Sequence, residues 1–308
     1  MVTRICFLAA LLAGCGGQLG IGGTTAPKAF QNFRAAQGAR HGDLLYVSDY
    51  TSPTGHVLIL SFPSGERLAT ISGFAPVSPC SDASGNVWIP GYVDGHASVY
   101  KFAHGGTKPI SKIAIPHRYG AQACAVDPTT GDLAVAGDTS INVFPGGVSG
   151  TPTHYDLGYA SPRDCAYDAH GNLYFDGAQG STAFYLLAEL TKGSSNFRYF
   201  SLDKRAGFYP TGLIWDGQHM AVEGFPGRRT DIYRFDVSGK KGDVVQVVRA
   251  TDLSRHPWFG VLGNELVGTA NENGTGILLW KYPQGGPPIA EFSRRFTDIQ
   301  GMTISVAQ

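Results

Sequence analysis

A short pattern of a glycine, a polar residue and an apolar run recurs along the chain. A clear copy is Gly85-Asn86-Val87-Trp88-Ile89, in which β-formers follow a Gly-Asn pair. Such pairs ahead of β-formers are turn and strand signals. The pattern starts at Gly42, Gly85, Gly131, Gly171, Gly217 and Gly263, so the steps are 43, 46, 40, 46 and 46 residues. A period of this length indicates a repeat architecture.

Each copy belongs to a unit of four predicted strands. A second apolar strand follows the glycine pattern, for example at 57–62, and a third closes the unit, for example at 67–71. A fourth strand precedes the glycine and often ends in Asp, as at 124–127. Units of four short strands are typical of propeller blades. The sequence therefore predicts an all-β fold, a six-bladed β-propeller with four-stranded antiparallel blades.

The end of the chain carries a predicted strand without a unit of its own. Residues 301–306 look like the strand at 212–215, yet no glycine pattern follows them. The first unit, in contrast, has a poor strand before Gly42. We therefore expect the C-terminal strand to pair into the first blade and close the ring, which leaves no long exposed edge.

The units resemble those of NHL-type six-bladed propellers, in which a Pro, an Asp and a Gly-Asn pair precede an apolar strand. Cys165 to Tyr174, with Pro162 upstream, is close to that pattern. The resemblance covers residues 30–308 and implies an architecture. It does not imply one activity, because such folds host binding modules, scaffolds, lactonases and lyases alike.

The N-terminus resembles that of a bacterial lipoprotein. The apolar run 5–12 is too short to cross the ~30 Å hydrocarbon core of a membrane, and it fits a signal peptide. Leu12-Ala13-Gly14-Cys15 matches the lipobox, whose cysteine becomes the acylated first residue. The resemblance implies export and anchoring through Cys15. Gly16, rather than Asp, favours the outer membrane of a Gram-negative bacterium. An ordinary signal peptide that contains a cysteine is the alternative.

The chain thus divides into three predicted parts. They are a signal peptide at 1–14, the lipidated Cys15 with a Gly-rich flexible tether at 15–29, and the propeller at 30–308. The 24 basic and 24 acidic residues balance, so no net field attracts nucleic acid. We expect a monomer whose contact with the membrane is the lipid anchor.

Three cysteines remain in the propeller. Cys124 and Cys165 each stand three residues before an Asp, whereas Cys80 stands two before one. An odd number without a CxxC motif does not indicate a disulfide framework. Two interpretations are open: a thiol cluster around a central channel, or small apolar side chains that pack between inner strands.

No sequence motif for a catalytic or metal site is present. The chain contains no HExxH, GxSxG, P-loop or EF-hand pattern, and its nine His do not stand at metal-ligand spacing. We therefore predict no metal site and no cofactor.

The loops carry the candidate binding residues. In antiparallel blades, loops that enter the first strand share a face with loops that join the second strand to the third. The first set contains aromatic and Arg residues, namely Tyr119, Arg163 with the adjacent Asp164, Tyr209, Arg255 and Trp258. The second set contains one acid per unit, namely Asp49, Asp94, Asp138, Asp176, Glu223 and Glu272. Acids near turns also bond their own backbone, so a purely structural role is the alternative.

The function predicted from these features is an extracytoplasmic module that binds a protein, a glycan or a small molecule through this loop face. An enzyme similar to the lactonase-like or lyase-like propellers is the alternative, and only that alternative would require a divalent cation. The acids do not match the lactonase ligand set residue by residue, which argues against it. An assembly scaffold is a third possibility.

Overall fold

The structure is a computed structural model that describes residues 42–50, 55–116, 119–180, 185–203, 212–225, 229–255, 257–270, 274–292 and 296–308. Within these ranges the regular structure is β-strand, apart from a single 3-10 turn at Pro145–Gly147. None of the described helical segments has the length and apolar character to cross a membrane. The predicted signal peptide, Cys15 and the tether lie outside the described residues.

Three of the sheets contain four antiparallel strands. The first has the order β25-β1-β2-β3, with bounds Ile299–Ser305, Leu44–Asp49, His56–Ser61 and Arg67–Ser72. The second has the order β12-β11-β10-β9, with bounds Thr153–Asp156, Ser140–Phe144, Leu133–Ala136 and Ala123–Val126. The third has the order β21-β22-β23-β24, with bounds Phe259–Leu262, Glu265–Ala270, Gly276–Lys281 and Ala290–Phe292.

Two further sheets vary this plan. In one, β4 and β5 both pair with β6, and β7 and β8 follow, with bounds Ala75–Pro76, Cys80–Ser81, Val87–Val93, His96–Phe102 and Pro109–Ala114. The other has the order β13-β14-β15-β16-β20-β19-β18-β17, with bounds Ala160–Tyr167, Leu173–Gln179, Tyr185–Leu190, Arg198–Leu202, Lys241–Val248, Asp231–Ser238, Met220–Gly224 and Leu213–Trp215. Its two four-stranded halves meet where β16 and β20 pair in parallel, at Ser201 with Lys241 and at Leu202 with Gly242.

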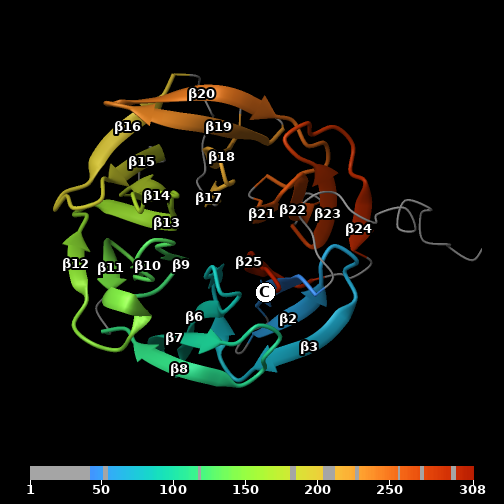
Figure 1. The fold of residues 1–308 in the computed structure, drawn as a ribbon, viewed down its shortest axis with the longest axis horizontal. Coiled ribbons are helices and arrows are strands. Elements are labelled where there is room, and N and C mark those ends of the chain that lie inside the picture. Colours follow the sequence, from blue (N-terminus) through green and yellow to red (C-terminus); the bar gives the residue numbers. More distant parts are fainter. Residues whose placement is uncertain are drawn as a thin grey trace, which may run out of the picture.

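The sheets stand around a central space in chain order (Figure 1). Strands β9, β13, β17, β21 and β25 lie near the centre, while β3, β8, β12, β16, β20 and β24 form the rim. The C-terminal strand β25 pairs with β1 from Leu44 with Ser305 to Asp49 with Ile299. The propeller-like arrangement of antiparallel sheets and the predicted pairing of the last strand with the first unit are both confirmed.

Apolar clusters between neighbouring sheets form the core. Leu45 of β1 packs in one cluster with Val267 of β22, and the adjacent Tyr46 packs in another cluster with Ile89 of β6. Successive side chains on a strand point to opposite faces, so β1 contacts a different neighbouring sheet on each side. All six residues of β1 are buried. Burial on both faces explains why the repeat reads as apolar runs rather than as an alternation of apolar and polar residues.

Candidate functional site

A central cavity of about 350 Å³ lies where the inner strands meet. Its lining comes from β5, β9, β13, β17, β21 and β25, which we call the inner strands, and from residues next to them. Most of the lining residues are apolar or small, and Asp164 is the carboxyl-bearing residue among them. Ser78, Ser81 and Thr303 add hydroxyl groups. Ligand sites in proteins are typically concave and apolar with a few polar groups, so this cavity is the candidate site.

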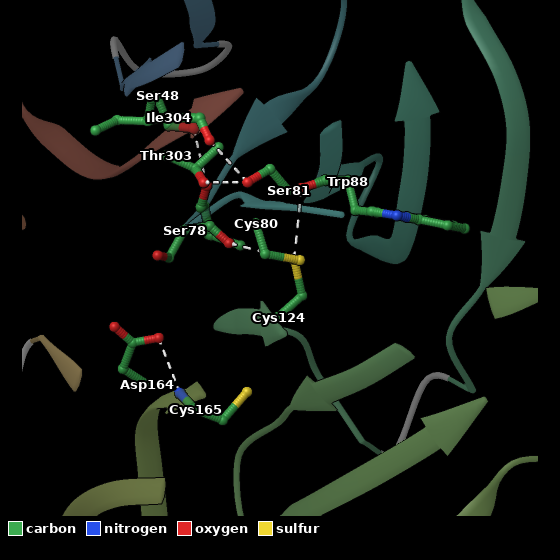
Figure 2. The surroundings of a disulfide bond; sticks show 11 residues. Ser48, Ser78, Cys80, Ser81, Trp88, Cys124, Asp164, Cys165, Thr303 and Ile304 are labelled. Carbon is green, nitrogen blue, oxygen red and sulfur yellow. Dashed lines mark hydrogen bonds between the residues drawn. A yellow bond between two sulfur atoms is a disulfide. The ribbon is translucent and has the colours of Figure 1, made fainter. Parts of the chain in front are cut away.

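A disulfide bond joins two neighbouring inner strands at the cavity wall. Cys80 of β5 and Cys124 of β9 are bonded, with a Cα–Cα distance of 5.5 Å (Figure 2). Cys165 of β13 is free and buried. The interpretation of all three cysteines as unpaired was therefore wrong for Cys80 and Cys124, and these three cysteines do not form a cluster of thiols.

The different spacing of Cys80 is the physical reason for the bond. Cys124 and Cys165 share a position relative to their following Asp, and each faces the sheet that precedes its own. Cys80 is one residue out of that register, and a shift of one residue on a strand turns the side chain to the other face. Cys80 therefore faces forward and meets Cys124, which faces back.

Asp164 carries the charge that reaches the cavity. Figure 2 shows its carboxylate directed toward the open centre, away from the Cys165 thiol. The side chain is 8 % exposed, and its oxygens accept the backbone N–H of Cys165 at 2.8 Å and of Leu213 in β17 at 3.2 Å. Burial raises the pKa of Asp164 to about 7, against the lowering effect of these two hydrogen bonds. Buried carboxyls with raised pKa values in a cavity are candidate functional groups.

Asp176 and Glu223 lie behind Asp164 and are fully or almost fully buried. Asp176 pairs with Asp164 across β13 and β14, and its Oδ1 accepts the Asp164 N–H at 2.8 Å. Its Oδ2 has no hydrogen-bond partner among the described residues. Burial, followed by repulsion from Asp164 and from Glu223, raises the pKa of Asp176 well above its usual value, while Arg163 acts in the opposite direction. The fold thus brings together three residues of the predicted face: Arg163, Asp176 and Glu223.

Two other acids of the predicted face have different surroundings. Asp49 is buried, and its Oδ1 accepts the N–H groups of Thr297 at 2.9 Å and Asp298 at 2.8 Å, so it holds the segment that leads to β25. Asp94 is exposed in the turn between β6 and β7, where its φ is 50°. The contacts of Asp49 are structural, but they are made to a segment distant in the chain and not to its own turn.

Another part of the predicted face gathers around Tyr119. Its ring stacks on His154 at a centroid distance of 4.3 Å, and its carbonyl accepts the N–H of Asp138. The exposed Arg255 lies 5.2 Å from the ring centre of Phe225. Trp258 lines the central cavity just before β21, and its N–H donates to Thr269. Tyr209 and Glu272 lie outside the described residues.

The ligands for a catalytic metal do not assemble in the described part of the chain. No group of three or more His, Cys, Asp or Glu side chains there has a geometry that could hold a metal ion. Asp164, Asp176 and Glu223 form a set of buried acids. Sequence reasoning placed Asp164 in a loop of the candidate face, but its burial beside Asp176 requires the pairing of β13 with β14.

Neither a known protein family nor a curated protein matches this sequence. Solved structures resemble the fold. A chain of a nidogen/laminin complex superposes with a TM-score of 0.63 at 15 % identity, over 87 % of this chain and 100 % of that chain. A protein of unknown function from Bacteroides caccae gives 0.59 at 15 % identity, over 86 % and 99 %. Apo AztD from Citrobacter koseri gives 0.50 at 12 % identity, over 87 % and 100 %.

Identities this low carry information on the fold alone. Together with the ring of antiparallel sheets, the superpositions show that the chain is a β-propeller.

Proposed function

We propose that this chain is an exported, lipid-anchored propeller that binds a ligand at one end of its central cavity. The observation that carries the proposal is the cavity itself, whose wall combines apolar side chains and hydroxyl groups with the single buried carboxyl of Asp164. One carboxyl on such a concave wall would orient a ligand. The environment that raises the pKa of Asp164 to about 7 supports a functional rather than a passive carboxyl.

The binding end is the one that the entering loops surround. Ser78 lies two residues before β5, Trp258 lies one residue before β21, and Asp164 bonds the first residue of β17. All three therefore mark the starts of inner strands. The exposed Arg163 and Arg255 belong to the same set of loops and would form the rim.

The blade count belongs to the proposal as well. The eight-stranded sheet separates into two halves of four strands that share two residue pairs in parallel. If each half is one blade, the ring has six blades. The cavity lining supports this count, because it draws on six inner strands.

Export and anchoring rest on two independent features. The Cys80–Cys124 disulfide supports an oxidising compartment, because disulfides rarely persist in a reducing cytosol. The lipobox ending at Cys15 supports acylation, and several acyl chains give stable anchoring. Metabolic labelling with a radioactive fatty acid tests this part. We expect label and membrane fractionation for the wild type and neither for Cys15→Ser, and label on the Ser variant would contradict acylation at Cys15.

Ligand binding is tested with the full chain in detergent. A library of soluble small molecules is screened for a rise in melting temperature, and each hit is repeated on Trp258→Ala and Asp164→Asn. We expect both variants to lose the response. Tyr199→Ala, which removes an exposed aromatic ring from the outer strand β16, is the control and should keep it. If the hits raised the melting temperatures of the wild type and of all three variants equally, the ligands would not bind in the central cavity.

A further inference from the structure

The wall of the central cavity has two unlike sides. Its carboxyl-bearing residue and its aromatic residues lie on the successive inner strands β13, β17 and β21, or directly before β21, and they are Asp164, Tyr167, Trp215, Trp258 and Phe259. The described lining residues on or next to β5, β9 and β25 are non-aromatic, and several of them carry hydroxyl groups. The charge and the aromatic rings are thus gathered on one side of the cavity.

The start of β17 brings an aromatic ring close to the carboxyl. The Leu213 N–H donates to Oδ2 of Asp164 at 3.2 Å. The Phe259 ring packs on Gly212, the residue before Leu213, so closely that a Cβ there would lie 2.7 Å from the ring atom Cε1. Asp164 and Phe259 therefore contact adjacent residues of one short segment. Trp258, next to Phe259, lines the cavity and is only partly buried, so part of its surface is open to a ligand.

The Asp164 carboxylate has room for a further partner. It accepts the N–H groups of Cys165 and Leu213, whereas a carboxylate can accept about four hydrogen bonds. Of the lining residues within the described ranges, none is an Arg, a Lys or a His. Burial raises the pKa of Asp164 and the two hydrogen bonds lower it, without a contribution from a positive side chain. Buried charges in proteins are usually paired, so a ligand with a positive charge would supply the missing partner.

The aromatic rings are a second reason to expect a positive ligand. The face of an aromatic ring attracts a cation within about 6 Å of its centre, and Trp does so most strongly. A hard metal ion, in contrast, requires about six to eight oxygen ligands. The hydroxyl group of Ser81 already donates to the Ile304 carbonyl at 2.8 Å and accepts the Thr303 hydroxyl at 3.3 Å (Figure 2). One carboxylate beside aromatic rings suits an organic cation better than a metal ion.

We propose that the ligand of the central cavity is a compact organic cation, namely an amine or quaternary ammonium ion with an apolar body. Its positive group pairs with Asp164, and its carbon surface packs on Trp258 and the neighbouring rings. A cavity of about 350 Å³ is large enough for a small ligand of this kind. The inference rests on the proposed binding at this cavity and names the class of its ligand.

The test compares cations with uncharged molecules of the same shape by isothermal titration of the full chain in detergent. One pair is choline and its carbon analogue, in which a carbon atom replaces the nitrogen, and the other is benzylamine and benzyl alcohol. At about pH 8, where Asp164 is ionised, each cation should bind the wild type about tenfold more tightly than its neutral partner. This comparison does not depend on the folding of any variant.

Asp164→Asn keeps the size of the side chain and removes its charge, so it should abolish most of the preference for the cations. Asp243→Asn, which removes an exposed acid on the outer strand β20, is the matched control and should keep that preference. Thermal unfolding followed by circular dichroism checks that both variants are folded.

Three outcomes would overturn the inference. Equal binding of a cation and its neutral partner would reject a cationic ligand, whereas ligand binding at the cavity would stand. A preference for cations that persists in Asp164→Asn would place the cation at another site. If neither cation bound, the cavity would not be a site for compact organic cations, and the library screen would then decide independently on the proposed binding.

Discussion

Two contacts between neighbouring inner strands use opposite chemistry. At one side of the central cavity, β5 and β9 are joined covalently by Cys80 and Cys124. At the other side, β13 and β17 are joined by a hydrogen bond from the Leu213 N–H to the buried carboxylate of Asp164. The first contact is part of an apolar cluster, whereas the second is backed by Asp176 and Glu223.

The comparison separates a contact that stabilises the ring, the disulfide, from a contact that carries a group suited to ligand binding, the Asp164 carboxylate. A disulfide stabilises a fold at any pH, as long as it stays oxidised. Buried acids with raised pKa values destabilise the fold at neutral pH, because the charged form has lost its water. Buried acids beside a cavity therefore lower the stability of the fold, but they also place an ionisable group where a ligand could contact it.

The largest expected effect comes from removal of the covalent contact. Cys80→Ala combined with Cys124→Ala should lower the free energy of unfolding by about 4 kcal/mol, since the bond closes a loop across a sequence separation of 44. Urea unfolding in oxidising buffer measures the loss. Wild-type protein in reducing buffer should show a similar loss, and equal stability of all samples would contradict a stabilising role for the bond.

The next effect concerns pH at the acidic contact. The folded-state pKa of Asp164, about 7, exceeds its unfolded value near 3.8, so the folded chain binds more protons between these limits. Stability from this group is present below about pH 4 and falls as pH rises to about 7, by at most about 1.4 kcal/mol per pH unit.

Burial and then repulsion from Asp164 also raise the pKa of Asp176, so Asp176 adds to the loss of stability as pH rises. Asp176→Asn should therefore flatten the overall fall, while it leaves the Asp164 N–H its acceptor. We expect a gain of about 2 kcal/mol at pH 8 relative to pH 5, compared with the wild type. Urea unfolding across this pH range is the measurement. Asp243→Asn, at an exposed position on β20, is the control. An unchanged slope for Asp176→Asn would contradict the assignment.

A designed bond can transfer the covalent contact to the next pair of inner strands. Ala125 stands two residues before Asp127, as Cys80 stands before Asp82, and it packs in the same cluster as Cys165. Ala125→Cys should therefore form a disulfide with Cys165 and add about 1.5 kcal/mol. Mass spectrometry and urea unfolding detect the two effects. Ala123→Cys, two residues away on the same side of β9, should leave its thiol free.

The smallest effect is expected for the unpaired cysteine. Cys165→Ala should cost about 1 kcal/mol or less, because it removes one buried sulfur atom and no covalent bond. The same unfolding assay is suitable. If the free energy of unfolding fell as much as in the double cysteine variant, Cys165 would have to form a stabilising contact in addition to its burial as a free thiol.

The architecture was largely predictable, and the chemistry between strands was not. The Gly-polar-apolar repeat predicted the strands and the role of residues 301–306, because strand and turn signals are local. The spacing of the cysteines did not predict the disulfide, because two cysteines on neighbouring inner strands meet only when their side chains point toward each other, and the sequence does not show which strands are neighbours. The odd number of cysteines showed only that not all three can pair with one another. It did not exclude one disulfide and one free thiol. The burial of Asp176 was also missed, since turn-like positions are usually exposed.

The sequence by itself determined a repeating set of antiparallel strands and a last strand that pairs with the first. These follow from the period of hydrophobic positions and from glycine turns, which act within a few residues. Only the tertiary structure decided which side chains meet: Cys80 with Cys124 between two sheets, and Asp164 with Asp176 across two strands of one sheet. Such meetings depend on the register and the facing side of strands that lie far apart in the chain, and composition or spacing carries little of that information.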